Sequence, residues 1–219
     1  MRPYDPERML VSVHIPKCAG TSFGEVLKAW FGERFHDHYP DDAIPGPPAR
    51  IESRARTCVH GHFYHHDYPI GVYDYYPDCA QMITVLRDPL EMMISSYFFQ
   101  RHAGTAEHTS VEDYLDAVLG WGELLYYRNL PFDVGSPEAI DIVEETFVWI
   151  GLADRLSDGV GVLARRLGHK RPARLPVLNV APRDGGVPEG YESKFRRTFE
   201  GEYRFYDALR WNIERELDR

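Results

Sequence analysis

The stretch His14-Ile15-Pro16-Lys17-Cys18-Ala19-Gly20-Thr21-Ser22-Phe23 joins two segments of opposite character. Residues 9–13, before it, are apolar and rich in β-branched side chains, which predicts a buried strand. Residues 23–31, after it, carry apolar side chains at helical spacing, which predicts a helix. Ser22 and Glu25 stand three positions apart and predict a capping box at the helix start. The sequence therefore predicts a strand, a tight loop and a helix.

This loop predicts a site for one small anionic group. Backbone N–H groups of a loop and of a helix N-terminus attract anions. Lys17 adds a positive charge, while Thr21 and Ser22 add hydroxyl donors. A nucleoside-triphosphate loop has Gly, four residues, Gly, and then Lys followed by Ser or Thr. Here the lysine comes early and only Gly20 lies within the loop, so we expect a single phosphate group. The alternative is an ordinary turn with an incidental lysine.

Length and composition predict one globular domain over residues 1–219, with 43% hydrophobic residues. No apolar run reaches the roughly 18 residues of a transmembrane helix, and no signal-peptide pattern opens the chain. We therefore expect a cytoplasmic protein with no membrane partner. Three cysteines, Cys18, Cys58 and Cys79, form no CxxC pair, which argues against a disulfide framework or a zinc ribbon. The net charge of −9 argues against a nucleic-acid partner.

Strand-like segments alternate with helix-like segments along the chain, which predicts an α/β fold with a mainly parallel sheet flanked by helices. Further strands are expected at 57–62, 79–86 and 147–152. Helices are expected at 89–102, 111–119, 137–147, 157–168 and about 190–217, the last as one helix or a pair. The Pro-rich residues 36–56 and the basic residues 169–190 predict loops. Ligands of such sheets bind at the carboxyl ends of the strands, where Lys17 and Arg87 are expected.

The run from Val85 to Phe99 predicts a second anion site. Asp88 is expected to cap a helix whose first residue is Pro89. Arg87, at the end of the preceding strand, offers a forked guanidinium that suits a phosphate. Ser95 stands two helical turns after the cap and about on the same face, so Arg87 and Ser95 can hold one phosphate. The alternative is an Asp-Pro cap with Arg87 in a surface ion pair.

Together, the two elements resemble those of sulfotransferases that use 3′-phosphoadenosine 5′-phosphosulfate (PAPS). Residues 16–22 resemble the loop that holds the 5′-phosphosulfate, and Arg87-Asp88-Pro89 with Ser95-x-Tyr97 resembles the 3′-phosphate element. His60-Gly61-His62 resembles a His-Gly-His motif of the carbohydrate branch, which includes the uronosyl 2-O-sulfotransferases. The family often has an arginine where this chain has Met92. The resemblance is good over about 10–100, weak at 147–167 and 178–180, and absent from 101–146.

The resemblance implies a sulfotransferase fold of the P-loop NTPase type and transfer of a sulfuryl group from PAPS to an acceptor hydroxyl of a carbohydrate or another small alcohol. The product nucleotide is adenosine 3′,5′-bisphosphate (PAP), and no metal is required. The implied catalytic residues are Lys17 and His62, with His60 in support. The implied donor-binding residues are Lys17, Cys18, Ala19, Gly20, Thr21, Ser22, Arg87, Ser95 and, from a late loop, Asn179 and Arg183. Acceptor contacts are expected within 101–146.

Histidines are concentrated after the second expected strand. The cluster is His60, His62, His65, His66 and Asp67. Loop packing, a metal site and general-base catalysis all remain open for it. The spacing matches no metal motif, and His65 and His66 have no counterpart in the resemblance. His36 and His38 are expected to be exposed, and His14 to finish the first strand.

Two other classes of function remain open. A nucleotide or nucleoside kinase needs Gly before the loop lysine and Ser or Thr directly after it, and both are absent. A non-catalytic binding module of the sulfotransferase type is the second, although the presence of Lys17 and His62 argues against it. The sequence indicates neither the acceptor nor the oligomeric state.

Overall fold

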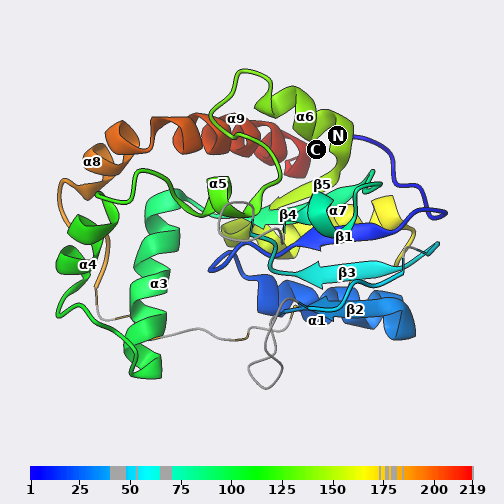
Figure 1. Ribbon diagram of the computed structural model, residues 1–219, viewed down its shortest axis with the longest axis horizontal. Helices are drawn as coiled ribbons and strands as arrows, with labels where there is room; N and C mark the ends of the chain where they lie inside the picture. The colour runs from blue at the N-terminus through cyan, green and yellow to red at the C-terminus, as the bar shows by residue number, and fades with distance from the viewer. Residues whose placement is uncertain are drawn as a thin grey trace.

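The computed structural model describes residues 1–39, 48–52, 54–64, 71–172, 174–175, 178, 182–183 and 185–218. Its described strands form one parallel sheet in the order β2-β3-β1-β4-β5 (Figure 1). The strands are β1 (Leu10–Val13), β2 (Phe35–His38), β3 (Cys58–Gly61), β4 (Met82–Leu86) and β5 (Phe147–Leu152). The predicted α/β fold with a parallel sheet is confirmed.

Helices connect and cover these strands. They are α1 (Gly20–Phe31), α2 (Val72–Tyr75), α3 (Pro89–Ala103), α4 (Val111–Val118), α5 (Leu125–Asn129), α6 (Ala139–Thr146), α7 (Leu156–Leu167), α8 (Tyr191–Thr198) and α9 (Glu200–Leu217). Short 3-10 turns at Gly32–Arg34 and Ala153–Arg155 follow α1 and β5. The expected C-terminal helix is therefore a pair, α8 and α9. Within the described part of the chain, no helix has the length and apolar character to cross a bilayer.

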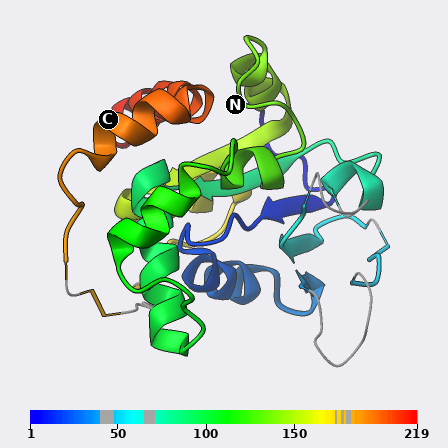
Figure 2. The ribbon, with the colours of Figure 1, turned by 60° about the vertical axis from the view of Figure 1, so that its left-hand side comes forward.

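The sheet is covered on both faces. Every residue of β1, β3, β4 and β5 is buried, and because strand side chains alternate between faces, both faces must be packed. Phe23 of α1 lies 5.5 Å from the buried ring of Trp149 in β5, and Gly159 of α7 is close-packed against the same ring. Helices α6 and α9 lie along β5 as well (Figures 1 and 2).

The strand order places a topological switch at β1. The chain runs from β1 to the β2 edge, returns through β3, and then crosses to β4 on the other side of β1. The loops that follow β1, β3 and β4 therefore converge at one edge of the sheet. Ligands of open α/β sheets bind at such a point, outside the carboxyl ends of the strands.

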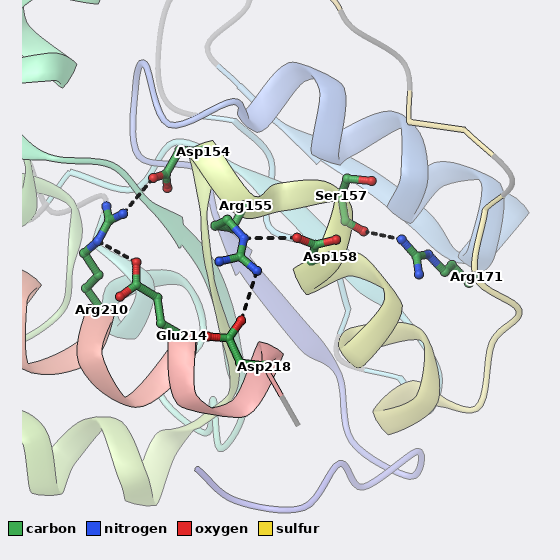
Figure 3. A network of polar contacts seen from close by, with 8 residues as sticks. All are labelled: Asp154, Arg155, Ser157, Asp158, Arg171, Arg210, Glu214 and Asp218. Carbon is green, nitrogen blue, oxygen red and sulfur yellow. Dashed lines mark hydrogen bonds and ion pairs between the residues drawn. The ribbon is translucent and has the colours of Figure 1, made fainter.

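The C-terminal helix α9 is tied to the turn between β5 and α7 by a network of ion pairs (Figure 3). Arg155 lies 3.0 Å from Asp158 and 3.4 Å from Asp218, and Arg210 lies 2.9 Å from Asp154. These side chains are partly exposed, so each pair contributes about 1 kcal/mol or less. Their effect is to fix the place of α9 along β5.

Two local predictions are wrong. Residues 36–56 were expected to be a loop, but Phe35–His38 form the edge strand β2, and His38 is buried rather than exposed. Ser22 and Glu25 form no capping box, because α1 already begins at Gly20 after Ala19 in a left-handed conformation. The helix expected at about 137–147 is present as α6, Ala139–Thr146.

Candidate active site

A cleft of about 600 Å³ opens where the loops after β1, β3 and β4 meet. That volume is typical of a site for a nucleotide-sized ligand. The cleft is lined by His14, Pro16, Lys17, Ala19, Gly20, Thr21, Ser22, Gly24, Glu25, Phe35, Asp37, Tyr39, His60, His62, Arg87, Ser95, Phe98, Phe99, Leu178 and Arg183. Most residues that the sequence assigns to the donor and to catalysis therefore share one cavity.

The loop after β1 is held in an unusual backbone conformation. Lys17 and Ala19 have φ angles of 66° and 61°, in the left-handed region that non-glycine residues rarely adopt. Such conformations recur at ligand-binding loops, where alternating backbone angles turn successive N–H groups toward an anion. The first turn of α1, from Gly20, adds N–H groups that have no partner within the helix. This loop therefore retains the shape of an anion cradle.

Cys18 does not line the cleft, although the sequence places it among the donor-binding residues. Its N–H donates to the Ile15 carbonyl at 3.2 Å, and its thiol is buried 3.5 Å from the sulfur of Met92. Met92, which stands where the resemblance implies an arginine, is fully buried beside this thiol. Burial raises the pKa of the Cys18 thiol to about 12, so it stays protonated and inert.

Lys17 and Arg87 meet directly. One guanidinium nitrogen of Arg87 donates to the Lys17 carbonyl at 3.2 Å, which joins the loop after β1 to the end of β4. The Lys17 ammonium lies 3.6 Å from the centre of the Phe99 ring, a cation–π contact. Burial, with the nearby positive charge of Arg87, lowers the pKa of Lys17 to about 8.

Glu91 forms ion pairs with both of the predicted donor-binding arginines. Its Oε2 lies 3.3 Å from Arg87 and 3.0 Å from Arg183 of the late loop. Arg183 also lies over the ring of Phe98 at 5.8 Å. Ser95 lines the cleft beside them, so the cleft brings together three of the predicted donor residues from distant parts of the chain. Asn179 lies outside the described residues.

The predicted cap of α3 is confirmed. The Asp88 carboxylate accepts from the N–H groups of Leu90 and Glu91 at 3.0 and 3.1 Å, and Pro89 is the first helical residue. Ser22 has a different partner from the one expected, since its hydroxyl accepts from the N–H of Leu178 at 3.1 Å. The late loop therefore contacts the first turn of α1 as well as α3.

Three imidazoles form the other end of the cleft. His60 is buried, its Nε2–H donates to the Gly20 carbonyl at 3.2 Å, and its Nδ1 accepts from the Ser12 hydroxyl at 2.9 Å. Both ring nitrogens are therefore engaged, which fixes one neutral tautomer. Burial lowers the pKa of His60 to about 4. His60 supports the start of α1 and has no nitrogen left for a substrate.

His62 lies at the wall of the cleft. Its Nδ1 is 3.3 Å from the Tyr64 hydroxyl, and its Nε2 is buried without a hydrogen-bond partner among the described residues. Burial lowers its pKa to about 4, so the ring is neutral at pH 7 and available as a proton acceptor. The predicted base is thus in the right protonation state, with one ring nitrogen uncommitted.

His14 is one of the cleft residues that sequence reasoning missed. It was expected only to end the strand, yet its ring stacks on His60 at 5.3 Å and lies 4.6 Å from His62. A side-chain carbon on Gly20 would lie 1.8 Å from this ring, so only glycine allows the loop and the imidazole to approach this closely. Burial lowers the pKa of His14 to about 2. The position of His14 at the carboxyl end of a predicted strand was the sequence feature that could have identified it as a cleft residue.

Phe35, Asp37 and Tyr39 also line the histidine end, and the sequence indicated none of them because β2 was not recognised. The described residues include no group of three His, Cys, Asp or Glu side chains arranged to hold a metal ion. His65, His66 and Asp67 of the predicted cluster lie outside the described residues.

Comparison with solved structures identifies the fold. The chain is similar to mouse sulfotransferase SULT7A1, solved in complex with PAP, with a TM-score of 0.55, 14% sequence identity, and coverage of 90% of this chain and 86% of that one. A retinol dehydratase solved with retinol and PAP is more distant, with a TM-score of 0.41, 14% identity, and coverage of 77% and 62%. No protein-family model and no curated protein matches the sequence. The α/β fold of this chain is the sulfotransferase fold.

Proposed function

We propose that this protein transfers a sulfuryl group from PAPS to an acceptor hydroxyl. The contact that carries the proposal is the 3.2 Å hydrogen bond from the Arg87 guanidinium to the Lys17 carbonyl, inside one cleft. Two anion-binding elements this close suit a nucleotide with a charged group at both its 5′ and its 3′ positions. The fold, shared with a sulfotransferase that binds PAP, supports the same nucleotide.

At the donor end, the residues stabilise the charge that develops as the nucleotide leaves. The bond between sulfur and the bridging phosphate oxygen breaks, and its electron pair stays on that oxygen. Lys17 and the N–H groups of the loop and the first turn of α1 stabilise this charge, with the Thr21 and Ser22 hydroxyls. Arg87, Ser95 and Arg183 hold the 3′-phosphate and orient the donor. The two arginines exchange their present contacts with Glu91 for the phosphate.

At the histidine end, a base completes the reaction. The acceptor oxygen forms the new bond to sulfur, and its proton passes to an imidazole. His62 is assigned this role because it is neutral at pH 7 and its Nε2 has no other partner among the described residues. His60 holds the start of α1 against β3. The acceptor is a carbohydrate or another small alcohol, in line with the resemblance of His60-Gly61-His62 to the carbohydrate branch.

The decisive experiment measures consumption of PAPS and formation of PAP with a panel of sugar and alcohol acceptors. A parallel calorimetric titration compares PAP with ATP and Mg²⁺. Binding of PAP in preference to ATP, together with acceptor-dependent release of PAP, is the expected result. Preferential binding of ATP–Mg²⁺ would support a kinase instead. Binding of PAP without turnover on any acceptor would support a non-catalytic binding module.

A further inference from the structure

The backbone of Arg87 is held on both of its polar groups by one buried side chain. The Arg87 N–H donates to the hydroxyl oxygen of Tyr126 at 3.1 Å, and the same hydroxyl donates to the Arg87 carbonyl. Tyr126 is fully buried. Arg87 is the first residue after β4, where the sheet no longer supplies partners for its backbone. Tyr126 replaces them with a side chain from α5.

The short helix that carries Tyr126 depends on a buried carboxyl group. Helix α5 has 5 residues, too few to be stable by itself. Oε1 of Glu202, in α9, accepts from the N–H of Leu124 at 2.9 Å and of Tyr127 at 3.4 Å, which are donors at the start of this helix. Glu202 is only 1% exposed. Burial raises its pKa to about 8, and Oε1 can accept these bonds in either protonation state.

The same helix α9 also supports the other side of Arg87. The hydroxyl of Tyr203 accepts from the N–H of Leu90 at 3.2 Å, in the first turn of α3. Neither Tyr126, Glu202 nor Tyr203 lines the cleft. Together, these buried contacts fix where the chain turns from β4 into α3, and therefore where the Arg87 guanidinium points.

We propose that Tyr126 and Glu202 are positioning residues that hold Arg87 in place for the 3′-phosphate of the donor. This inference rests on the proposed function, because it assigns the 3′-phosphate to Arg87. Its consequence is selective: loss of the Tyr126 hydroxyl weakens ligands that carry a 3′-phosphate and leaves ligands without one unaffected. A purely structural role would weaken both kinds of ligand alike.

The test is Tyr126→Phe, which removes the hydroxyl and keeps the ring. Calorimetry compares PAP with adenosine 5′-monophosphate, which lacks the 3′-phosphate. We expect the affinity for PAP to fall about tenfold, as for loss of one buried hydrogen bond, and the affinity for the monophosphate to be unchanged. The KM for PAPS should rise while kcat changes little. Equal losses for both nucleotides, or no loss for either, would overturn the proposal.

Tyr206→Phe is the matched control. Tyr206 is a buried tyrosine of α9 whose ring lies 6.5 Å from that of Tyr126, but its hydroxyl accepts from Arg210 at 2.7 Å and not from the Arg87 backbone. This variant should retain the preference for PAP. If it loses that preference to the same extent, the effect is not specific to Arg87 and the proposal fails.

Glu202 gives a second, independent test. Glu202→Gln keeps an oxygen that accepts the N–H groups of α5 and should retain the preference for PAP. Glu202→Leu removes that oxygen and should lower the preference in the same way as Tyr126→Phe. If both variants behave alike, Glu202 is not a positioning residue. A wild-type protein that binds PAP no better than the monophosphate would instead overturn the proposed function, and this inference with it.

Discussion

The two ends of the cleft differ in charge, since one carries cations and the other carries neutral imidazoles. The donor end holds three positive charges, Lys17, Arg87 and Arg183, balanced by Glu91 and by aromatic faces. The histidine end holds imidazoles that burial keeps neutral, with pKa values lowered to about 4 for His62 and about 2 for His14. The proposed function assigns anion binding to the first end, and to the second the acceptance of a proton by an uncharged base.

This difference would let a single cavity bind a polyanion and still deprotonate an alcohol, as the proposed reaction requires. A protonated histidine next to the donor would add a third kind of cation and could not act as a base. Burial keeps these imidazoles uncharged, but because it lowers their pKa values it also makes them weaker bases. The cations at the other end lie against a carboxylate or an aromatic ring, since Arg87 and Arg183 contact Glu91 and Lys17 contacts Phe99. Each variant below changes one end and leaves the other intact.

Lys17→Ala should have the largest effect. It removes the charge closest to the leaving phosphate, so we expect turnover to fall by about 10³-fold or more, on the scale of losing a principal electrostatic stabiliser. The assay is acceptor-dependent PAP release. The control is Lys28→Ala, which changes an exposed lysine of α1, the helix that follows the Lys17 loop. A near-normal rate in the Lys17 variant would show that Lys17 does not stabilise the charge on the leaving phosphate.

His62→Ala should have the next largest effect, confined to the chemical step. Loss of a general base costs about 10²- to 10³-fold in kcat. PAP affinity, measured by calorimetry, should be unchanged because the donor end remains intact. His102→Ala, at the exposed end of α3, should change neither quantity. If the His62 variant loses PAP binding, then His62 maintains the structure of the cleft and is not its base.

Arg87→Ala should affect binding more than chemistry. A charge-assisted hydrogen bond contributes about 1.5–3 kcal/mol, so the KM for PAPS should rise by roughly 10- to 100-fold. The activity or binding of adenosine 5′-phosphosulfate, which has no 3′-phosphate, should hardly change. Arg34→Ala, an exposed arginine, provides the control. An equal loss with both donors would mean that Arg87 does not recognise the 3′-phosphate.

The pH dependence of kcat/KM should report on both ends of the cleft, through His62 on its acid limb and through Lys17 on its alkaline limb. Protonation inactivates His62 as a base, so kcat/KM should fall only as the pH approaches its pKa of about 4. Deprotonation removes the charge of Lys17, so activity should fall again as the pH rises through about 8. An acid limb near 6.5, the ordinary histidine value, would show that the base is solvated and not held neutral by burial.

Glu91→Gln should give the smallest change, in the opposite direction. Glu91 competes with the 3′-phosphate for Arg87 and Arg183, and its removal should tighten PAP binding by about threefold, as for one partly exposed ion pair. Calorimetry at two salt concentrations measures this change in PAP affinity. Weaker binding would show instead that Glu91 holds the arginines in their binding positions.

The sequence was most informative where local pattern and chemistry agree. The order strand, loop, helix around Lys17 and the Asp88 cap before α3 follow from apolar spacing and capping preference, and the structure confirms both. The short edge strand β2 was missed because Phe-His-Asp-His has no run of apolar residues and precedes a Pro-rich segment. The histidine end was therefore only partly predicted.

Long-range contacts explain the other errors. Nothing local shows that Tyr126 holds the backbone of Arg87, or that Glu202 in turn binds the start of α5. His14 was placed at the strand end correctly, but its stacking on His60 depends on how β1 and β3 pair. The roles assigned to Lys17, His62, Arg87, Ser95 and Arg183 stay predictions until the variants above are measured.

The sheet order has a consequence for synthesis of the chain. Strand β1 pairs in the sheet with residues 58–61 and 82–84, and the helices that flank Arg87 are supported by Glu202 and Tyr203. Pairings this distant along the chain form slowly. The contacts that hold Arg87 beside the Lys17 loop can therefore form only after residues 202–203 have been made, so binding of the proposed donor should report a late stage of folding.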